Sequence, residues 1–203
     1  MPNWTMNKVY VSGPPKIVAD LKHVVSTRDM RVPEEQRSYF DFNSIIPMPS
    51  PLRTVNQGHC VDDNGVKCSI WRKINGKNIA VPKSTLQRWR RDYGYVSWYD
   101  WASANWGTKW NPGDVELKVD NPDLKVYEFN TAWAPPWPIY RRLVEAYPEL
   151  QITWEYSLED EGYERWHTYP KGILGIKEAQ EDYDKAEEAL EKWKAQLDKN
   201  LGQ

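Results

Sequence analysis

The chain has 203 residues, a formal net charge of −2 and 28% charged residues, which fits one domain of moderate size with an appendage. Twelve Trp and twelve Tyr supply buriable area, roughly 150–250 Å² per ring, so a core can form without disulfides. Two cysteines are too few for a disulfide framework, and no apolar run approaches the roughly 18 residues that span a bilayer. These features exclude a disulfide-rich secreted domain and a helical membrane protein. We expect a soluble, cytoplasmic protein.

The first part of the chain predicts a strand, a helix and a second strand. Residues 7–13, NKVYVSG, alternate apolar and polar side chains and predict a strand. Pro14 and Pro15 open residues 16–27, where the apolar side chains recur at helical spacing and predict a helix. Residues 38–49, SYFDFNSIIPMP, are aromatic and β-branched, which predicts a second strand.

The later part repeats this order. Residues 124–131, LKVYEFNT, predict a strand, and the prolines of APPWP, residues 134–138, preset the start of a helix. Residues 150–156, LQITWEY, show strict alternation and predict a half-buried fourth strand. Two β-α-β units predict an α+β fold, the ferredoxin-like βαββαβ sandwich with both helices on one face of an antiparallel sheet. We expect this domain over residues 1–156, with a long insertion, residues 50–123, between strands 2 and 3.

The insertion contains a basic segment, residues 64–91, with eight Lys and Arg and no acidic residue. Within it, Ser84 and Gln87 have the spacing of a capping box, which predicts a short basic helix through Arg91. Tryptophans lie among the cations, a pattern that suits phosphate contact with base stacking. Docking onto an acidic protein surface would need the same residues, so both partners stay open. The predicted partner-binding residues are Arg72, Lys73, Lys77, Arg88, Trp89, Arg90 and Arg91.

A second feature of the insertion is the stretch YGYVSWYDWASANWGTKWN, residues 93–111, with four Trp and three Tyr. Gly107 permits a sharp turn that brings Trp110 back beside Trp106. An aromatic core with satisfied polar groups is the first interpretation, and a site where a base or another flat ligand stacks, with Lys109 contacting a phosphate, is the alternative. The predicted ligand pocket consists of Trp98, Trp101, Asn105, Trp106, Lys109 and Trp110.

The C-terminal part predicts a linker, residues 157–175, followed by a long helix over residues 176–203. Apolar side chains recur there at spacings of three and four, which is a heptad pattern with charged outer positions. The seam either packs against its own domain or pairs with a second copy or another protein. It consists of Ile176, Ala179, Tyr183, Ala186, Leu190, Trp193 and Leu197.

Signatures of metal binding and catalysis are scarce. His59, Cys60 and Cys68 fall short of the four ligands, usually in paired short spacings, that a structural zinc site needs. The cysteines are either plain buried thiols or a redox-sensitive pair. No nucleophile elbow, HExxH, Walker or dinucleotide motif is present, so we expect neither an enzyme nor a cofactor.

Four motifs resemble a known family. MPNW with VSGP, FDFNSIIPMP, YGYVSWYDWASANWGTKWN and EFNTAWAPPWP occur in this order and are similar to the YubB-type ferredoxin-like family of phages and conjugative plasmids. The resemblance covers most of residues 1–156. It implies a ferredoxin-like fold and a mobile-element origin, and it supplies no catalytic residues.

Together these features predict a non-catalytic, phage- or plasmid-encoded binding protein. We expect a stoichiometric inhibitor of a bacterial defence component, such as a CRISPR effector, that presents an acidic surface. A nucleic-acid-binding module using the basic segment is the alternative, and a nucleotide or small-molecule binder using the tryptophans is the second alternative. A dimer through the C-terminal helix also stays open.

Overall fold

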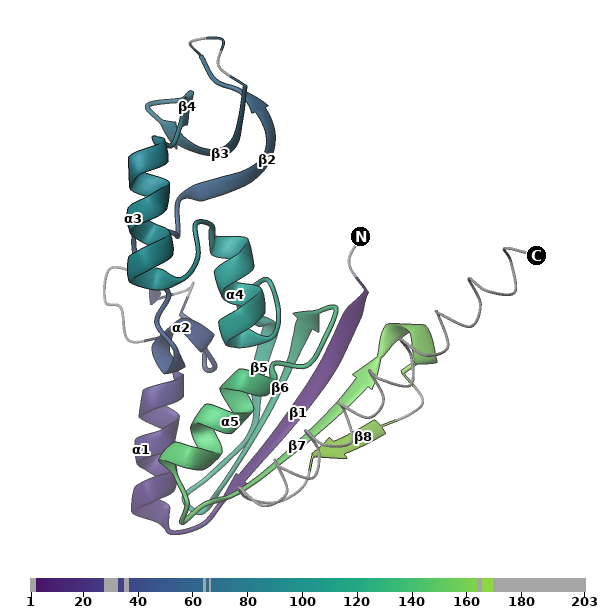
Figure 1. The fold of residues 1–203 in the computed structure, drawn as a ribbon. Helices are drawn as coiled ribbons and strands as arrows, with labels where there is room; N and C mark the ends of the chain where they lie inside the picture. The colour runs from purple at the N-terminus through teal and green to yellow at the C-terminus, as the bar shows by residue number, and fades with distance from the viewer. Residues whose placement is uncertain are drawn as a thin grey trace, which may run out of the picture.

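The structure is a computed structural model, and it describes residues 3–27, 33–34, 37–63, 65, 67–163 and 166–169. Its main feature is a five-stranded antiparallel sheet with α1 and α5 against one face (Figure 1). The strand order is β5-β6-β1-β7-β8. The strands are β1 (Trp4–Ser12), β5 (Gly113–Asn121), β6 (Leu124–Ala132), β7 (Gln151–Leu158) and β8 (Trp166–Tyr169), and the helices are α1 (Pro15–Val25) and α5 (Trp137–Ala146).

The first four strands in this order and the two helices make the predicted ferredoxin-like arrangement. Along the chain the elements run β1, α1, β5, β6, α5, β7, which is the βαββαβ order. In the central strand β1, every second side chain from Thr5 to Val11 is buried, as the alternation predicts. The buried amide of Asn7 is satisfied there, because its Nδ2 donates to Thr131 Oγ1 at 2.9 Å and its Oδ1 accepts from Trp154 Nε1 at 3.1 Å.

The predicted second strand at residues 38–49 is wrong. Asp41 accepts a hydrogen bond from the backbone N–H of Asn43 at 2.9 Å and thereby caps a short helix, α2 (Phe42–Ile45). Phe40 and Phe42 do enter the core, which accounts for the aromatic pattern, but they do so from a loop and a helical turn.

The second strand of the ferredoxin-like sheet is instead β5, which forms a hairpin with β6. The insertion therefore lies between α1 and β5 and ends before Gly113, whereas the sequence predicted residues 50–123 between strands 2 and 3. Val115, Leu117 and Val119 alternate with charged residues in β5, so the sequence carries a strand pattern here that the prediction assigned to the insertion.

The core under the sheet is built from aromatic rings. Phe40 stacks on Phe129 with ring centroids 5.0 Å apart and meets Tyr127 edge to face at 5.1 Å. Trp154, which is fully buried, meets Phe40 and Tyr140 edge to face. Edge-to-face and offset pairs of this kind add about 0.5–1.5 kcal/mol each beyond the burial of their area. Aromatic side chains thus fill the volume that aliphatic side chains fill in many domains.

The insertion forms a protruding lobe and a connecting helix. The lobe, called the insert lobe from here on, comprises residues 55–93 and stands beyond one end of the main sheet (Figure 1). The connecting helix, α4 (Trp98–Trp106), leads back to the sheet and contacts α5. The lobe consists of β2 (Val55–Val61), β3 (Lys67–Ile74), β4 (Lys77–Ala80) and α3 (Lys83–Tyr93), with the strands in the order β2-β3-β4.

Part of the predicted linker, residues 157–175, belongs to the sheet. β7 continues to Leu158, and β8 pairs with it in antiparallel register. The ring of His167 on β8 stacks on Tyr156 of β7 with centroids 4.9 Å apart. Residues 176–203, with the predicted helix and its seam, lie outside the described residues.

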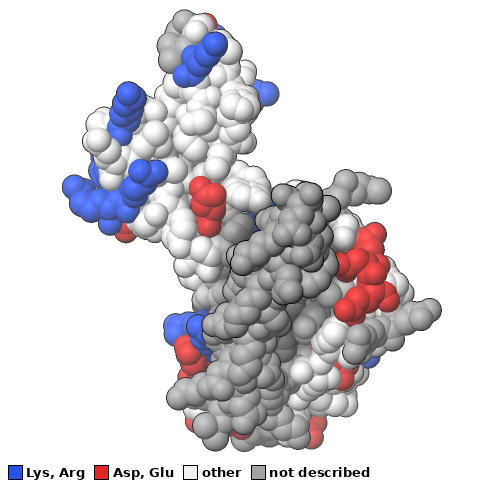
Figure 2. All heavy atoms as spheres, turned by 45° about the vertical axis from the view of Figure 1, so that its right-hand side comes forward, with Lys and Arg blue, Asp and Glu red and all other residues white. Residues whose placement is uncertain are grey.

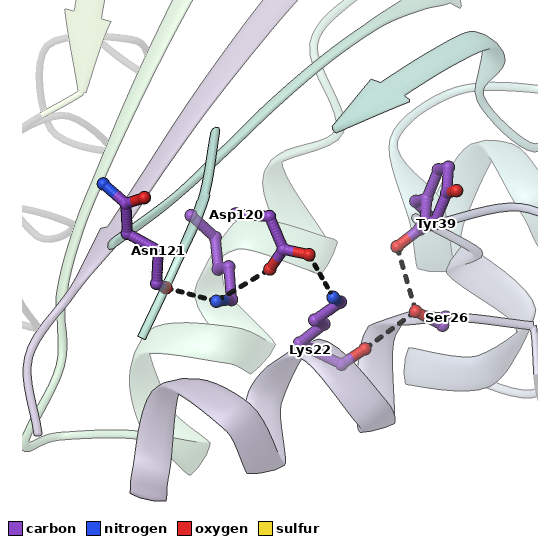
Figure 3. Close-up of polar contacts among 6 residues, drawn as sticks. Lys22, Ser26, Tyr39, Asp120 and Asn121 are labelled. Atoms are coloured by element: carbon purple, nitrogen blue, oxygen red, sulfur yellow. Dashed lines mark hydrogen bonds and ion pairs between the residues drawn. The ribbon is translucent and has the colours of Figure 1, made fainter. Parts of the chain in front are cut away.

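An ion-pair cluster ties the edge strand β5 to α1. Asp120 accepts from Lys22 Nζ at 2.6 Å and from Lys125 Nζ at 2.8 Å, and Lys125 also donates to the backbone oxygen of Asn121 (Figure 3). Lys125 is buried, so Asp120 compensates a charge that is largely removed from water. The hydrogen bonds from Lys125 and then from Lys22 lower the pKa of Asp120 below its usual 3.8.

We expect Asp120→Asn to lower the free energy of unfolding at pH 7 by about 1–2 kcal/mol, because it removes the charge partner of buried Lys125 while Asp120 itself stays half exposed. A carboxyl with a lowered folded-state pKa contributes stability above pH 3.8 and loses it as the pH falls through the folded-state value. The difference in melting temperature between wild type and variant should therefore shrink below pH 3.8. Asp123→Asn, at an exposed carboxylate in the same hairpin, is the control and should change little. A difference that does not vary with pH would contradict this account.

Candidate functional site

The insert lobe is anchored by one tryptophan and one arginine. Trp89 is the buried residue of α3, at 3% exposure. The guanidinium of Arg72 lies over its ring, 4.6 Å from the centroid, and Arg72 Nη2 donates to the backbone oxygen of Pro51 at 2.5 Å. Of the seven predicted partner-binding residues, these two lie inside the lobe. They hold α3 against β3 and the segment that precedes β2.

The other five predicted partner-binding residues are exposed on the surface of the lobe. On the face drawn in Figure 2, Lys and Arg side chains gather on the lobe, and a group of Asp and Glu side chains lies on the main domain. Arg91 has an exposed ion pair with Asp92 at 2.9 Å, a contact that contributes little stability. The five exposed cations are Lys73 and Lys77 on the β3–β4 hairpin and Arg88, Arg90 and Arg91 on α3.

Helix α3 begins and ends in a way that suits its charge. It begins at Lys83 after Pro82 and has no side-chain cap, so the predicted cap at Ser84 is wrong and Ser84 lies in the first turn. Arg90 and Arg91 lie in the last turn, where cations interact favourably with the helix dipole. The predicted basic helix through Arg91 is present and extends to Tyr93.

The lobe has few acidic residues, and one of them is buried. Residues 55–93 contain eight Lys and Arg against three Asp. Asp62 is only 7% exposed, and Asp63 accepts a hydrogen bond from the backbone N–H of Asn78 at 3.1 Å. Asp62 is thus withdrawn from the surface, whereas Asp63 and Asp92 stay exposed. Positive charge dominates the exposed surface of α3 and the β3–β4 hairpin.

The tryptophan-rich stretch forms α4 and the turn after it. Trp101 and Trp106 are buried and meet edge to face at 5.5 Å, and Trp106 Nε1 donates to the backbone oxygen of Ile46 at 2.9 Å. Gly107 has a φ of +79°, and a Cβ there would lie 2.9 Å from Pro138 Cδ, so this turn requires glycine. The interpretation of the stretch as core is correct for Trp101 and Trp106.

Three tryptophans of this stretch, Trp98, Trp106 and Trp110, line a shallow hollow of about 280 Å³, called the tryptophan hollow below. Of the predicted pocket residues, Trp101 and Asn105 do not line it, since Trp101 is buried and Asn105 Nδ2 donates to the backbone oxygen of Trp101. The lining residues are Asn43, Met48, Arg53, Trp98, Trp106, Lys109, Trp110 and Asn111.

Lys109 lies between two exposed indole rings. Its Nζ is 4.0 Å from the ring centroid of Trp110 and 5.6 Å from that of Trp133. Trp110 is 41% exposed and Trp133 is 58% exposed, values that contrast with the buried Trp101 and Trp106. An ammonium over indole faces is a cation–π arrangement.

Trp133 also has an unusual backbone. Its φ is +75°, a left-handed conformation that disfavours a side chain, and its N–H donates to the backbone oxygen of Asn3 at 2.9 Å. The sequence reasoning missed Trp133 and Arg53. Trp133 stands in the motif EFNTAWAPPWP, but local sequence does not distinguish a ring that faces solvent from one that enters the core.

The two cysteines face each other across β2 and β3. Cys60 and Cys68 are directly paired in the register, and both thiols are free and partly exposed. Partial burial, together with the neighbouring Cys60 thiol, raises the pKa of Cys68. With His59 they line a hollow of about 480 Å³. Over the part of the chain that the structure describes, no three His, Cys, Asp or Glu side chains come together to hold a metal ion.

Comparison with known families agrees with the fold. A family model described as the ferredoxin-like domain in Api92-like proteins matches residues 105–198. Comparisons with curated proteins and with solved structures gave no significant match. The family match and the strand order support a ferredoxin-like domain. Among the described residues, no helix is long and apolar enough to cross a membrane.

The matched region covers one part of the fold. It includes β5, β6, α5, β7 and β8, whereas β1, α1 and the whole insert lobe lie before it. The basic insert lobe therefore lies outside the region that the family model matches.

Proposed function

We propose that the protein is a non-catalytic binding protein whose insert lobe engages an acidic surface of another protein. The observation that carries this proposal is the set of five exposed cations, Lys73, Lys77, Arg88, Arg90 and Arg91, on a lobe that projects from the domain. Positive surfaces of this kind steer association with a negative partner and set its orientation.

The packing of Trp89 favours a protein partner over nucleic acid. Binding of single-stranded nucleic acid combines phosphate contacts with base stacking on exposed rings, each stack contributing about 1–3 kcal/mol. In the lobe, Trp89 is only 3% exposed, so it offers no face to a base. The chain has 29 Asp and Glu against 27 Lys and Arg, and only three of these acids lie in the lobe, so the rest of the chain is acidic and opposes a long polyanion.

The partner class follows from the resemblance to proteins of phages and conjugative plasmids. A mobile element gains when its product occludes a host protein that would otherwise attack the element. We therefore propose a stoichiometric inhibitor of a bacterial defence component, with a CRISPR effector as the first class to test. This step rests on lineage and on the absence of catalytic motifs in the sequence.

Nucleic-acid binding through the same five cations is the second candidate, because Arg and Lys contact phosphates as readily as carboxylates. The two candidates differ in salt dependence. Each phosphate neutralised contributes about −0.7 to −0.9 to the log–log slope of affinity against salt, so three to five contacts give about −2 to −4.5. An acidic protein partner should show chiefly slower association at higher salt.

Affinity capture from bacterial cells that express a tagged chain tests the proposal. We expect one host protein in a fixed ratio to the bait, retained after nuclease treatment, and reduced occupancy when the bait carries Arg→Glu changes on α3. Loss of the captured material on nuclease treatment would favour the nucleic-acid candidate. Capture that is equal for wild type and the charge-reversed bait would contradict both.

A further inference from the structure

We propose that the tryptophan hollow is a binding site for one nucleotide unit, whose phosphate contacts Lys109 and Arg53 and whose base stacks on the indoles of Trp98 and Trp110. The hollow joins two cations and these two rings within about 280 Å³. This volume lies just below the roughly 300 Å³ at which pockets for small molecules begin, so the hollow would cover only part of one nucleotide and leave the rest in solvent. The site is separate from the exposed cations of the insert lobe and goes beyond the proposed function.

The charges of the hollow are available to an anion. Lys109 has no ion pair or hydrogen bond with any other part of the chain that the structure describes, and its Nζ lies over the ring of Trp110 and near that of Trp133. A base that stacks on this face of Trp110 would displace the ammonium, which would then contact the phosphate. Arg53 donates from Nε to the backbone oxygen of Met48 at 3.2 Å and from Nη2 to Asn43 Oδ1 at 3.0 Å, which fixes the guanidinium at the wall of the hollow. Neither contact neutralises its charge, so a phosphate would meet two cations there.

The carboxylate of Asp41 is hydrogen-bonded to two residues of the lining, Asn43 and Asn111, and its oxygens are already occupied by donors. Asp41 accepts from Asn111 Nδ2 at 2.9 Å, from the backbone N–H of Asn43 and from Thr27 Oγ1. It is 7% exposed and does not line the hollow. Among the described residues the lining is therefore positive and contains no acid.

The stacking surface is held in place before any ligand arrives. Trp110 is braced by Trp4, whose ring centroid is 6.1 Å away at an interplanar angle of 40°. The next residue, Asn111, accepts from the backbone N–H of Phe42 at 2.8 Å, in addition to its bond with Asp41. A fixed ring loses little conformational entropy on binding, which favours recognition of a flat ligand.

Titration with AMP, adenosine and inorganic phosphate, followed by calorimetry and tryptophan fluorescence, tests this site. AMP should bind and should quench the fluorescence, whereas adenosine and phosphate, which each supply half of the contacts, should bind at least about tenfold more weakly. Lys109→Gln should weaken AMP binding by about tenfold, and Trp110→Ala by about fivefold or more. Both variants should keep a melting temperature close to that of the wild type, because neither side chain is buried.

Matched controls separate this site from the lobe. Lys16→Gln removes an exposed lysine on α1 and should leave AMP affinity unchanged, as should replacement of the α3 arginines with glutamate.

A second probe, a 5′-phosphorylated oligothymidylate, shows whether the natural ligand is a free nucleotide or the end of a nucleic-acid strand. Tighter binding than AMP indicates a strand end, and weaker binding indicates a free nucleotide. Absence of saturable binding for both probes, or AMP affinity that is unaffected by Lys109→Gln and Trp110→Ala, would overturn the proposal. Either result leaves the proposed function of the lobe intact.

Discussion

Replacing Trp106 with alanine is expected to lower the free energy of unfolding by about 3–5 kcal/mol, because a large ring leaves a cavity in a packed core. Trp106 is 5% exposed, meets Trp101 and Phe42 edge to face, and donates from Nε1 to the backbone oxygen of Ile46. The substitution removes both the ring contacts and the hydrogen bond, which leaves the oxygen of Ile46 without that donor. Urea denaturation followed by circular dichroism measures the effect.

Trp110→Ala provides the matched control within the same stretch. Trp110 is 41% exposed, so its replacement should cost less than about 1 kcal/mol. If Trp106→Ala does not fold, Trp106→Phe keeps most of the ring area but lacks the N–H group, and should cost about 1–2 kcal/mol. Equal costs at Trp106 and Trp110 would contradict the division of this stretch into a buried core and an exposed surface.

The sequence predicted the strands and helices that bury one face and expose the other, because this gives them a regular pattern of apolar and polar residues. Residues 7–13 and 150–156 alternate because one face of β1 and of β7 packs on the helices, and both strands are confirmed. The two helices are confirmed as α1 and α5 for the same reason, since each has a single buried stripe. These elements alone were enough to indicate the ferredoxin-like class.

The second strand was misassigned because a loop near residue 40 shares the aromatic alternation of a strand. Phe40 and Phe42 are separated by one polar residue, as in a strand, yet that residue, Asp41, caps a helical turn. The real strand, β5, lies at the edge of the sheet and carries charged side chains on its outer face, where Glu116 and Lys118 form ion pairs. Edge strands often carry such charges, which prevent pairing with other chains. In β5 they alternate with Val115, Leu117 and Val119, so the strand was predictable from its own sequence.

The candidate sites were predictable in part. The excess of positive charge on the lobe is visible in the sequence because α3 has few apolar positions, and its arginines are exposed. The internal position of Arg72 and Trp89 depends on a contact between β3 and α3, which are separated by a hairpin, and no local pattern encodes it. Arg53 and Trp133 escaped notice for the same reason, because residues far apart in sequence bring them to the neighbourhood of Lys109.

Replacing Arg88, Arg90 and Arg91 with glutamate is expected to abolish partner binding. The change converts three exposed positive charges on one helix into negative ones, and like charges facing an acidic partner cost several kcal/mol. Folding should suffer little, because exposed charges contribute little to stability. The two glutamates introduced at positions 90 and 91 lie in the last turn and oppose the helix dipole, so the free energy of unfolding should fall by no more than about 1 kcal/mol.

Arg→Lys at the same three positions is the control, because it keeps the charge and changes the geometry of the donors. If charge steers the partner, most of the affinity should remain in the lysine variant. If the partner is held by bidentate bonds from guanidinium groups, the lysine variant should lose affinity as well, although less than the glutamate variant. Binding that is identical in all three proteins would place the partner surface away from α3.

The measurement that tests the role of the insert lobe most directly is the association of the captured host protein with the wild-type chain and with its Arg88, Arg90 and Arg91 glutamate variant, by biolayer interferometry after nuclease treatment. The account predicts nuclease-resistant binding for the wild type, an association rate that falls as salt rises, and no measurable binding for a variant that remains folded by its melting temperature. Undiminished binding of the folded variant, or wild-type binding that disappears with nuclease, would contradict an acidic protein partner at this lobe.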